Sequence, residues 1–238
     1  MSVNAHGQDA SATVELLWGD RAAPTRGPKR SLSVEQIADA AVSTADVEGI
    51  EAVSMQRVAE SLDLTKMSLY RYVSGKSELV AVMIERAVGD PPDLGRVRGG
   101  WRPRLERWAR LMSAAWDEHP WLPWATVGDR VIGPREAGWT EAAVAAMNET
   151  PLAPDQRMDV VTTVSGLLRN TQSGIVTGTQ PWHAEPHVQL VREHADRFPA
   201  LGQVVAGAQA RKPRQARDFG LSCFLDGVEL QIMKRSEH

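Results

Sequence analysis

The sequence predicts an all-α protein with two helical domains of unequal size, and three observations support this fold class. Apolar residues recur at every third or fourth position through most of the chain, which is the period of a helix with one buried face. Beyond Gly100, no stretch alternates apolar and polar residues as a half-buried strand does. Glycine and proline interrupt the helical pattern between Gly89 and Gly100, so we expect a linker at residues 91–100.

Length and composition set the class of protein. The 238 residues are enough for one large domain or two modest ones, and the formal net charge of −3 excludes a chain that binds polyanions along its whole length. No apolar run approaches the ~18 residues of a membrane helix, and the N-terminus lacks the pattern of a secretory signal. With one cysteine, no internal disulfide can form. We therefore expect a soluble, cytoplasmic protein with no membrane partner.

Residues 1–30 show no sustained helical period. Their last ten residues contain four cations, separated by glycine and proline: Arg21, Arg26, Lys29 and Arg30. The sequence therefore predicts a flexible basic arm over residues 1–30, in which the piece Val14–Gly19 forms at most a helical turn.

Four helices are expected in the first domain, residues 31–90. Ser33, Ser54 and Thr65 are suitable N-caps for the first three, because a hydroxyl accepts a hydrogen bond from a free amide of the first turn. Gly89 follows the fourth. The predicted helical segments are 34–48, 55–62, 65–73 and 76–88.

The second domain, residues 101–238, shows further helical stripes. The first of these helices ends at His119-Pro120, since proline cannot continue a helix. A Trp-Leu-Pro-Trp turn follows it. The expected helices are 101–118, 135–148, 155–177, a weaker 183–197, and 214–234.

Two short helices joined by a tight turn, at residues 54–73, match a helix-turn-helix. In that motif the second helix lies in the major groove of DNA. From Thr65 to Lys76 there are three cations, Lys66, Arg71 and Lys76, and no carboxylate, although the first 90 residues as a whole are acidic. The positive charge is therefore concentrated on the segment that would contact and neutralise DNA phosphates. Asp63 occupies the turn and tolerates the left-handed backbone conformation better than most residues.

The segment Val53–Val80 resembles the DNA-binding signature of the tetracycline-repressor (TetR) family. That signature runs from a helix-turn-helix into a Leu-Tyr-x-x-x-x-x-Lys-x-x-Leu block, which Leu69, Tyr70, Lys76 and Leu79 match. Asp63 stands where many relatives have glycine, and Val73 replaces a commonly aromatic residue. The resemblance implies a double-stranded DNA operator, with residues 65–68 at base edges and Ser54, Tyr70, Tyr72 and Lys76 on phosphates. The candidate DNA-binding residues are Ser54, Gln56, Arg57, Thr65, Lys66, Met67, Ser68, Tyr70, Arg71, Tyr72 and Lys76.

Seven of the eight tryptophans lie between Trp101 and Trp182. The resemblance implies a small-molecule pocket in this domain, and irregular aromatic segments commonly line apolar cavities. The alternative for each tryptophan is that it fills the core. The candidate ligand-binding residues are Trp108, Trp116, Trp121, Trp124, Trp139 and Trp182.

The resemblance also implies a homodimer through helices 155–177 and 214–234, and the alternative is that these helices pack only within the chain.

The sequence contains only weak signals for metal binding or catalysis. His183 and His187 flank Glu185 at a spacing that resembles metal ligands, but Pro186 interrupts the helix that would align them. There is no Gly-x-Ser-x-Gly elbow and no phosphate-binding glycine loop. Cys223 lies in an apolar helical stripe, where we expect a buried, inert thiol. We expect no metal, no cofactor and no enzymatic activity.

The sequence therefore predicts a DNA-binding transcriptional regulator. The expected form is a repressor that binds a palindromic operator as a dimer and is released by a small apolar effector. Two alternatives stay open: a constitutive DNA-binding module without an effector, and an enzyme that uses the tryptophan-rich cavity with His119, His183 and His187. The basic arm either enters a minor groove or is a solubilising tail.

Overall fold

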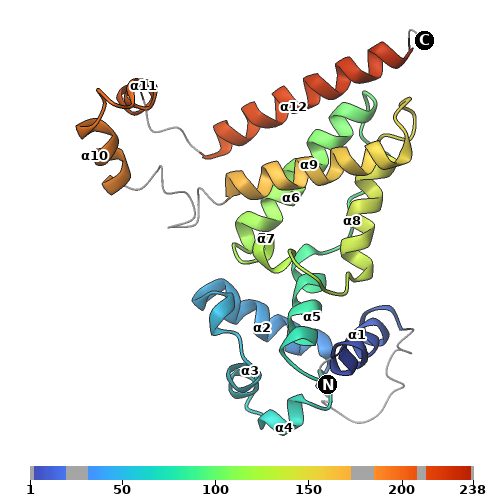
Figure 1. The fold of residues 1–238 in the computed structure, drawn as a ribbon. Coiled ribbons are helices and arrows are strands. Elements are labelled where there is room, and N and C mark those ends of the chain that lie inside the picture. The colour runs from blue at the N-terminus through green and yellow to red at the C-terminus, as the bar shows by residue number, and fades with distance from the viewer. Residues whose placement is uncertain (1–2, 20–31, 173–184, 208–212, 237–238) are drawn as a thin grey trace.

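The computed structural model describes residues 3–19, 32–172, 185–207 and 213–236, and within these ranges it contains helices and no strands (Figure 1). The all-α fold class is confirmed. The N-terminal elements are α1 (Val3–Trp18), α2 (Val34–Glu48), the 3-10 helix η1 (Ile50–Ala52), α3 (Met55–Ser61), α4 (Lys66–Leu69) and α5 (Lys76–Val88). The C-terminal elements are α6 (Trp101–Glu118), α7 (Leu122–Ala125), α8 (Pro134–Ala145), α9 (Pro154–Gln172), α10 (Glu185–Glu193), α11 (Pro199–Gly207) and α12 (Pro213–Ser236).

The three predicted N-caps are confirmed, and they explain where the N-terminal helices begin. Ser33 accepts a hydrogen bond from the Gln36 amide, while the Gln36 side chain accepts one from the Ser33 amide, so the pair forms a capping box. The Ser54 hydroxyl accepts from the Arg57 amide at 3.1 Å and begins α3. The Thr65 hydroxyl accepts from the Ser68 amide at 3.2 Å and begins α4.

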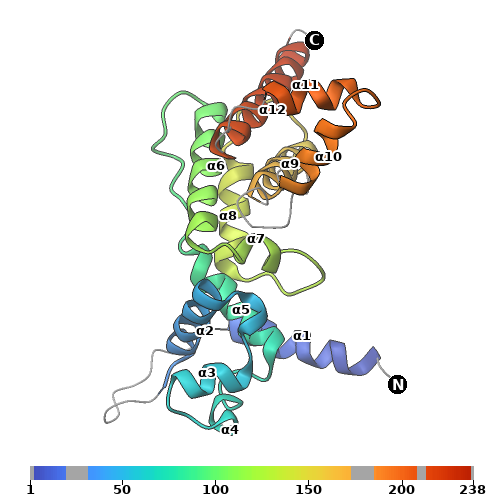
Figure 2. The same ribbon diagram turned by 90° about the vertical axis from the view of Figure 1, so that its left-hand side faces the viewer.

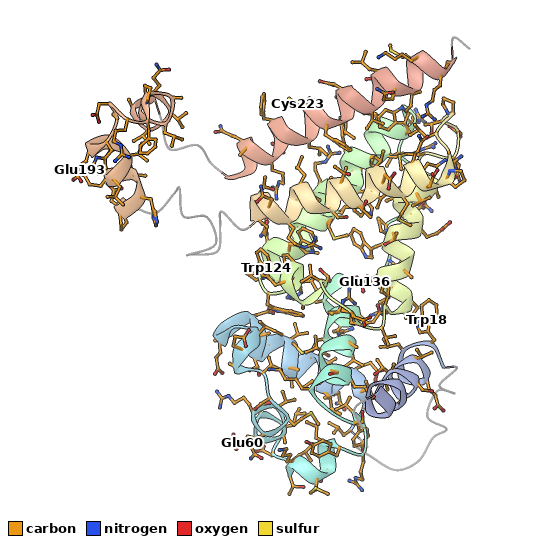
Figure 3. All side chains as sticks on the ribbon, viewed as in Figure 1. Trp18, Glu60, Trp124, Glu136, Glu193 and Cys223 are labelled. Carbon is orange, nitrogen blue, oxygen red and sulfur yellow. The ribbon has the colours of Figure 1, made fainter. Side chains whose placement is uncertain are left out.

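Helix α1 (Val3–Trp18) differs from the flexible arm that the sequence predicts over residues 1–30. Leu16 and Leu17 pack against the core, and the Trp18 indole nitrogen donates to the carbonyl oxygen of Ile132 at 2.9 Å (Figure 3). The helix is fixed by these tertiary contacts with a distant segment, which the periodicity of a short stretch does not reveal. The four cations of the expected arm lie outside the described residues.

The two predicted domains share one hydrophobic core. Helix α5 packs on α2 at one end and on α7 and α8 at the other, so it joins the two halves (Figures 1 and 2). The segment expected as a linker, residues 91–100, contains no helix, yet its Leu94 side chain is buried in the common core. The connection between the two halves is therefore held by the packing of Leu94 in the core.

Helices α6, α8 and α9 form the body of the C-terminal half, and α12 lies along α9 at the end of the molecule opposite α4 (Figure 1). Cys223 is exposed, so the expectation of a buried thiol is wrong. Leu221, Leu225 and Val228 are the buried residues of α12, which packs on α9, and Cys223 lies about half a helical turn from both leucines. Helix α11 was not predicted, and α7 forms in the Trp-Leu-Pro-Trp stretch expected as a turn.

Among the described residues, no helix combines the length and the apolar character needed to cross a membrane.

Candidate functional site

The turn between α3 and α4 has the geometry that the sequence predicts. Asp63 adopts a left-handed backbone conformation with φ of 55°, and among the described non-glycine residues it alone has a positive φ. The Leu64 amide donates to the carbonyl oxygen of Ala59 at 2.9 Å, which closes the turn after α3. An aspartate in place of glycine therefore still reverses the chain and sets α4 across α3.

Helix α4 is held by its apolar face, and its polar face is left outside. The Leu69 side chain is fully buried, and Val73 beyond the helix is buried as well. Lys66 is exposed, and the Met67 side chain is 74% exposed. The Lys66 ammonium lies 5.8 Å from the centre of the exposed Tyr70 ring. Tyr72 packs partly against the core, so it has less surface for a phosphate than Tyr70 has.

Two candidate residues on α3 already have carboxylate partners. The Arg57 guanidinium contacts Glu48 at 2.7 Å, and the Gln56 side chain donates to Glu60 at 2.6 Å. Hydrogen bonding to Glu48 raises the pKa of Arg57, so its guanidinium stays charged. Both side chains are exposed, and each would exchange its carboxylate for a phosphate to contact DNA.

The start of α5 adds a helix N-terminus next to α4. Lys76 is exposed at the first position of this helix, where free amide groups and the helix dipole favour an anion. Glu78 is buried, and its carboxylate accepts a hydrogen bond from the Ser74 amide at 2.5 Å. Sequence reasoning missed Glu78, although a glutamate three residues after the Gly75 cap is a known N-terminal signal.

Helices α3 and α4 and the beginning of α5 lie together at one end of the molecule (Figure 2). The exposed candidate residues at this end are Ser54, Gln56, Arg57, Thr65, Lys66, Met67, Tyr70, Arg71 and Lys76. Ser68 and Tyr72 are partly buried. The structure thus brings the residues predicted from two helices and a helix start onto one surface.

The candidate ligand-binding tryptophans separate into groups. Three have buried indoles whose N–H groups donate within the protein: Trp108 to the Trp139 carbonyl at 2.9 Å, Trp139 to the Gly89 carbonyl at 3.3 Å, and Trp121 to the Asp46 carboxylate at 2.7 Å. Trp116 is also buried, but its indole N–H has no partner among the described residues. Trp124 belongs to α7 and is exposed (Figure 3), and Trp182 lies outside the described residues.

Two carboxylates of the N-terminal half bind groups of the C-terminal half. Glu85 of α5 is buried and accepts hydrogen bonds from the Arg135 amide at 2.8 Å and the Glu136 amide at 3.1 Å, at the N-terminus of α8. Asp46 of α2 contacts the His119 ring at 2.9 Å in addition to Trp121. Sequence reasoning missed both. For Glu85 the signal was a carboxylate within the apolar stripe of α5, and Gly133 ahead of α8 has no side chain to cap that helix.

Comparison with known proteins covers both halves of the chain. Residues 37–83 match the model for bacterial regulatory proteins of the tetR family, and residues 92–232 match the model for the tetracyclin repressor-like C-terminal domain. The chain belongs to the TetR family. This TetR-family protein is 32% identical over 243 aligned positions to the HTH-type transcriptional repressor DrrR1 of Streptomyces coeruleorubidus, with 95% of this chain and 88% of that protein covered. An HTH-type transcriptional regulator of Saccharopolyspora erythraea is 23% identical over 80% of this chain and 76% of that protein.

Solved structures show the same fold. A possible TetR-family regulator of Streptomyces coelicolor superposes with a TM-score of 0.71 at 22% identity, over 83% of this chain and 99% of that one. ActR of the same species, in complex with actinorhodin, superposes with a TM-score of 0.70 at 19% identity, over 86% of this chain and 98% of that one. The TetR-family chain described here is a DNA-binding transcriptional regulator and not an enzyme.

Proposed function

We propose that this regulator is a repressor that binds a palindromic operator as a homodimer and leaves it when a small molecule enters the C-terminal half. The observation that carries the proposal is the α4 surface, where Lys66, Met67 and Tyr70 are exposed on a helix anchored by a fully buried Leu69. A rigid anchor with a polar outer face is what reading base edges requires. The similarity to a named repressor over nearly the whole chain supports repression, rather than activation, of the target gene.

The dimer is supported by the outer face of α12. Leu230 of α12 is 55% exposed, and Cys223 and Met233 of the same helix are exposed too. Met158, on the adjacent α9, is also exposed. Apolar side chains on the outside of a long helix pair are typical of a surface that another copy covers. Two copies joined there would carry two α4 surfaces, one for each half of a palindrome.

The effector is supported by ActR, which was crystallised with actinorhodin and with (S)-DNPA. In this chain a structural change caused by a bound ligand would reach the DNA-binding half through α5. Glu85 links α5 to α8, and Asp46 links α2 to the segment after α6. A displacement of α6 or α8 by a ligand would therefore reach the DNA-binding half, and a small change in the spacing of the two α4 helices is enough to lose one half-site.

The proposal is tested by a gel shift with the DNA that flanks the protein's own gene. Wild type is expected to shift this fragment, the Lys66→Ala and Tyr70→Phe variants to shift it weakly, and one member of a small-molecule panel to release it. Binding that is indifferent to every compound would favour a constitutive DNA-binding module. We propose the cytoplasm as the place of action, because the DNA target is there.

A further inference from the structure

Three buried polar atoms between α6 and α9 have no hydrogen-bond partner among the described residues. They are Ser113 Oγ, Trp116 Nε1 and Gln172 Oε1. Their residues are only 3%, 3% and 1% exposed, respectively. Native proteins pair nearly all buried polar atoms, so three unpaired atoms on two adjoining helices require an explanation.

These residues belong to one cluster. Ser113 and Trp116 are three positions apart and share a face of α6, as Arg169 and Gln172 do on α9. The Gln172 amide nitrogen donates to the Trp116 carbonyl at 3.3 Å and to the Asp117 carboxylate at 2.9 Å. The Arg169 guanidinium carbon lies 5.5 Å from the centre of the Trp116 ring. The α6 and α9 faces are therefore held against each other at this point.

Arg169 gives the buried part of the cluster a positive charge, because Asp117, the carboxylate that Gln172 binds, is exposed to solvent. Its guanidinium is half-buried and donates to neutral acceptors, the Pro123 carbonyl at 2.8 Å and the Thr126 hydroxyl at 3.5 Å. No carboxylate lies within 4 Å of it in the part of the chain that the structure describes. Burial, and then the neighbouring Arg130 charge, lower the pKa of Arg169. Arg130 itself forms an ion pair with Glu136, so Glu136 is already engaged.

The other buried candidate tryptophans do not share this property. Trp108, Trp121 and Trp139 each donate their N–H to a protein oxygen. Trp116 thus differs from them by having a donor that is still available. A molecule with an anionic oxygen would pair that donor, the Ser113 hydroxyl and the Arg169 guanidinium together.

We infer that Ser113, Trp116, Arg169 and Gln172 form the polar end of the effector site, and that the effector is a small organic acid. Its ionised carboxylate or acidic phenol binds Arg169, Ser113 and the Trp116 N–H, and a hydroxyl or amide N–H next to it donates to Gln172 Oε1. The rest of the effector is an apolar body. This inference rests on the proposed function, and it replaces a wholly apolar effector with one that has a charged end.

Two fluorescent probes with the same anilinonaphthalene framework, one with and one without a sulfonate group, test the charge. The probes are 8-anilinonaphthalene-1-sulfonate, which is anionic, and N-phenyl-1-naphthylamine, which is uncharged. Both are titrated into the full-length protein and into its Arg169→Gln, Arg169→Lys and Arg110→Gln variants. Arg110 is exposed on α6 and is the matched control for loss of one positive charge.

The expected result is a loss of about ten-fold in affinity for the sulfonate in Arg169→Gln, with affinity for the uncharged probe unchanged. Arg169→Lys keeps most of the affinity because it keeps the charge, and Arg110→Gln behaves as wild type. Trp116→Phe, which removes the N–H and keeps an aromatic ring, weakens the sulfonate by a smaller factor.

Equal effects of Arg169→Gln on both probes, no effect on either, or no binding of either probe to wild type would each overturn the inference. The same preparations are titrated with operator DNA. If DNA is bound and the charge preference is absent, only this inference fails. If wild type binds no DNA, the proposed function fails, whatever the probes show.

Discussion

Glu85 offers the sharpest test of how the two halves are joined. Its carboxylate lies in α5 and accepts two amide hydrogen bonds from the first turn of α8, at 2.8 and 3.1 Å. The side chain is buried, and the N-cap of α8 is Gly133, which has no side chain of its own. We predict that Glu85→Gln destabilises the protein and that the loss originates at this contact.

The size of the effect follows from what the substitution removes. Hydrogen bonds to an ionised group are each worth about 1.5–3 kcal/mol, and a charge at a helix N-terminus adds about 0.3–2 kcal/mol. Glutamine keeps one acceptor but loses the charge, and its NH2 group faces an amide N–H that it cannot accept from. We therefore expect a loss of about 2 kcal/mol in the free energy of unfolding. For a protein of this size the melting temperature would fall by about 4–8 °C.

Thermal unfolding followed by circular dichroism measures this, with Glu141→Gln as the control. Glu141 is on α8 but exposed, so its replacement should change stability by no more than about 0.5 kcal/mol. Equal melting temperatures for the two variants would refute the reasoning, because the buried position of Glu85 would then contribute nothing.

Three further predictions address other contacts. Asp46→Ala leaves the Trp121 indole N–H unpaired and should lower the unfolding free energy by about 1–3 kcal/mol in calorimetry; an unchanged melting temperature would contradict the bridge from α2 to the segment after α6. Leu230→Glu should convert a dimer to a monomer in sedimentation velocity, whereas Val47→Glu, on exposed α2 surface, should not; a persistent dimer would place the interface elsewhere. Gly133→Ala should cost about 1–3 kcal/mol, because the added methyl group overlaps the Glu85 carboxyl, and wild-type stability would mean that this contact has room to spare.

Local sequence signals predicted the DNA-binding half well. The hydroxyl caps at Ser33, Ser54 and Thr65 act within three residues, and the left-handed turn at Asp63 is a property of one residue. Such features depend on neighbours in the chain, so the sequence contains them.

Contacts between distant segments were not predictable in this way. Helix α1 is docked through Trp18 on Ile132, which is 114 residues away, and α8 is capped by a carboxylate from α5. Cys223 was misplaced because it lies on the side of α12 opposite to the buried Leu221 and Leu225, and only the packing of α12 on α9 identifies the buried face. The sequence did not distinguish Trp116 from the other buried tryptophans, because they differ only in whether the indole N–H has a hydrogen-bond partner.

Binding of operator DNA by the α4 surface is tested most directly by fluorescence anisotropy with a labelled duplex from the DNA flanking the protein's own gene. Wild type is expected to bind this duplex more tightly than an unrelated one, with affinity that falls as salt rises. Lys66→Ala should bind about ten-fold more weakly, and Arg110→Ala, on exposed α6, should bind as wild type does. Full affinity in Lys66→Ala, or equal binding of the two duplexes by wild type, would contradict it.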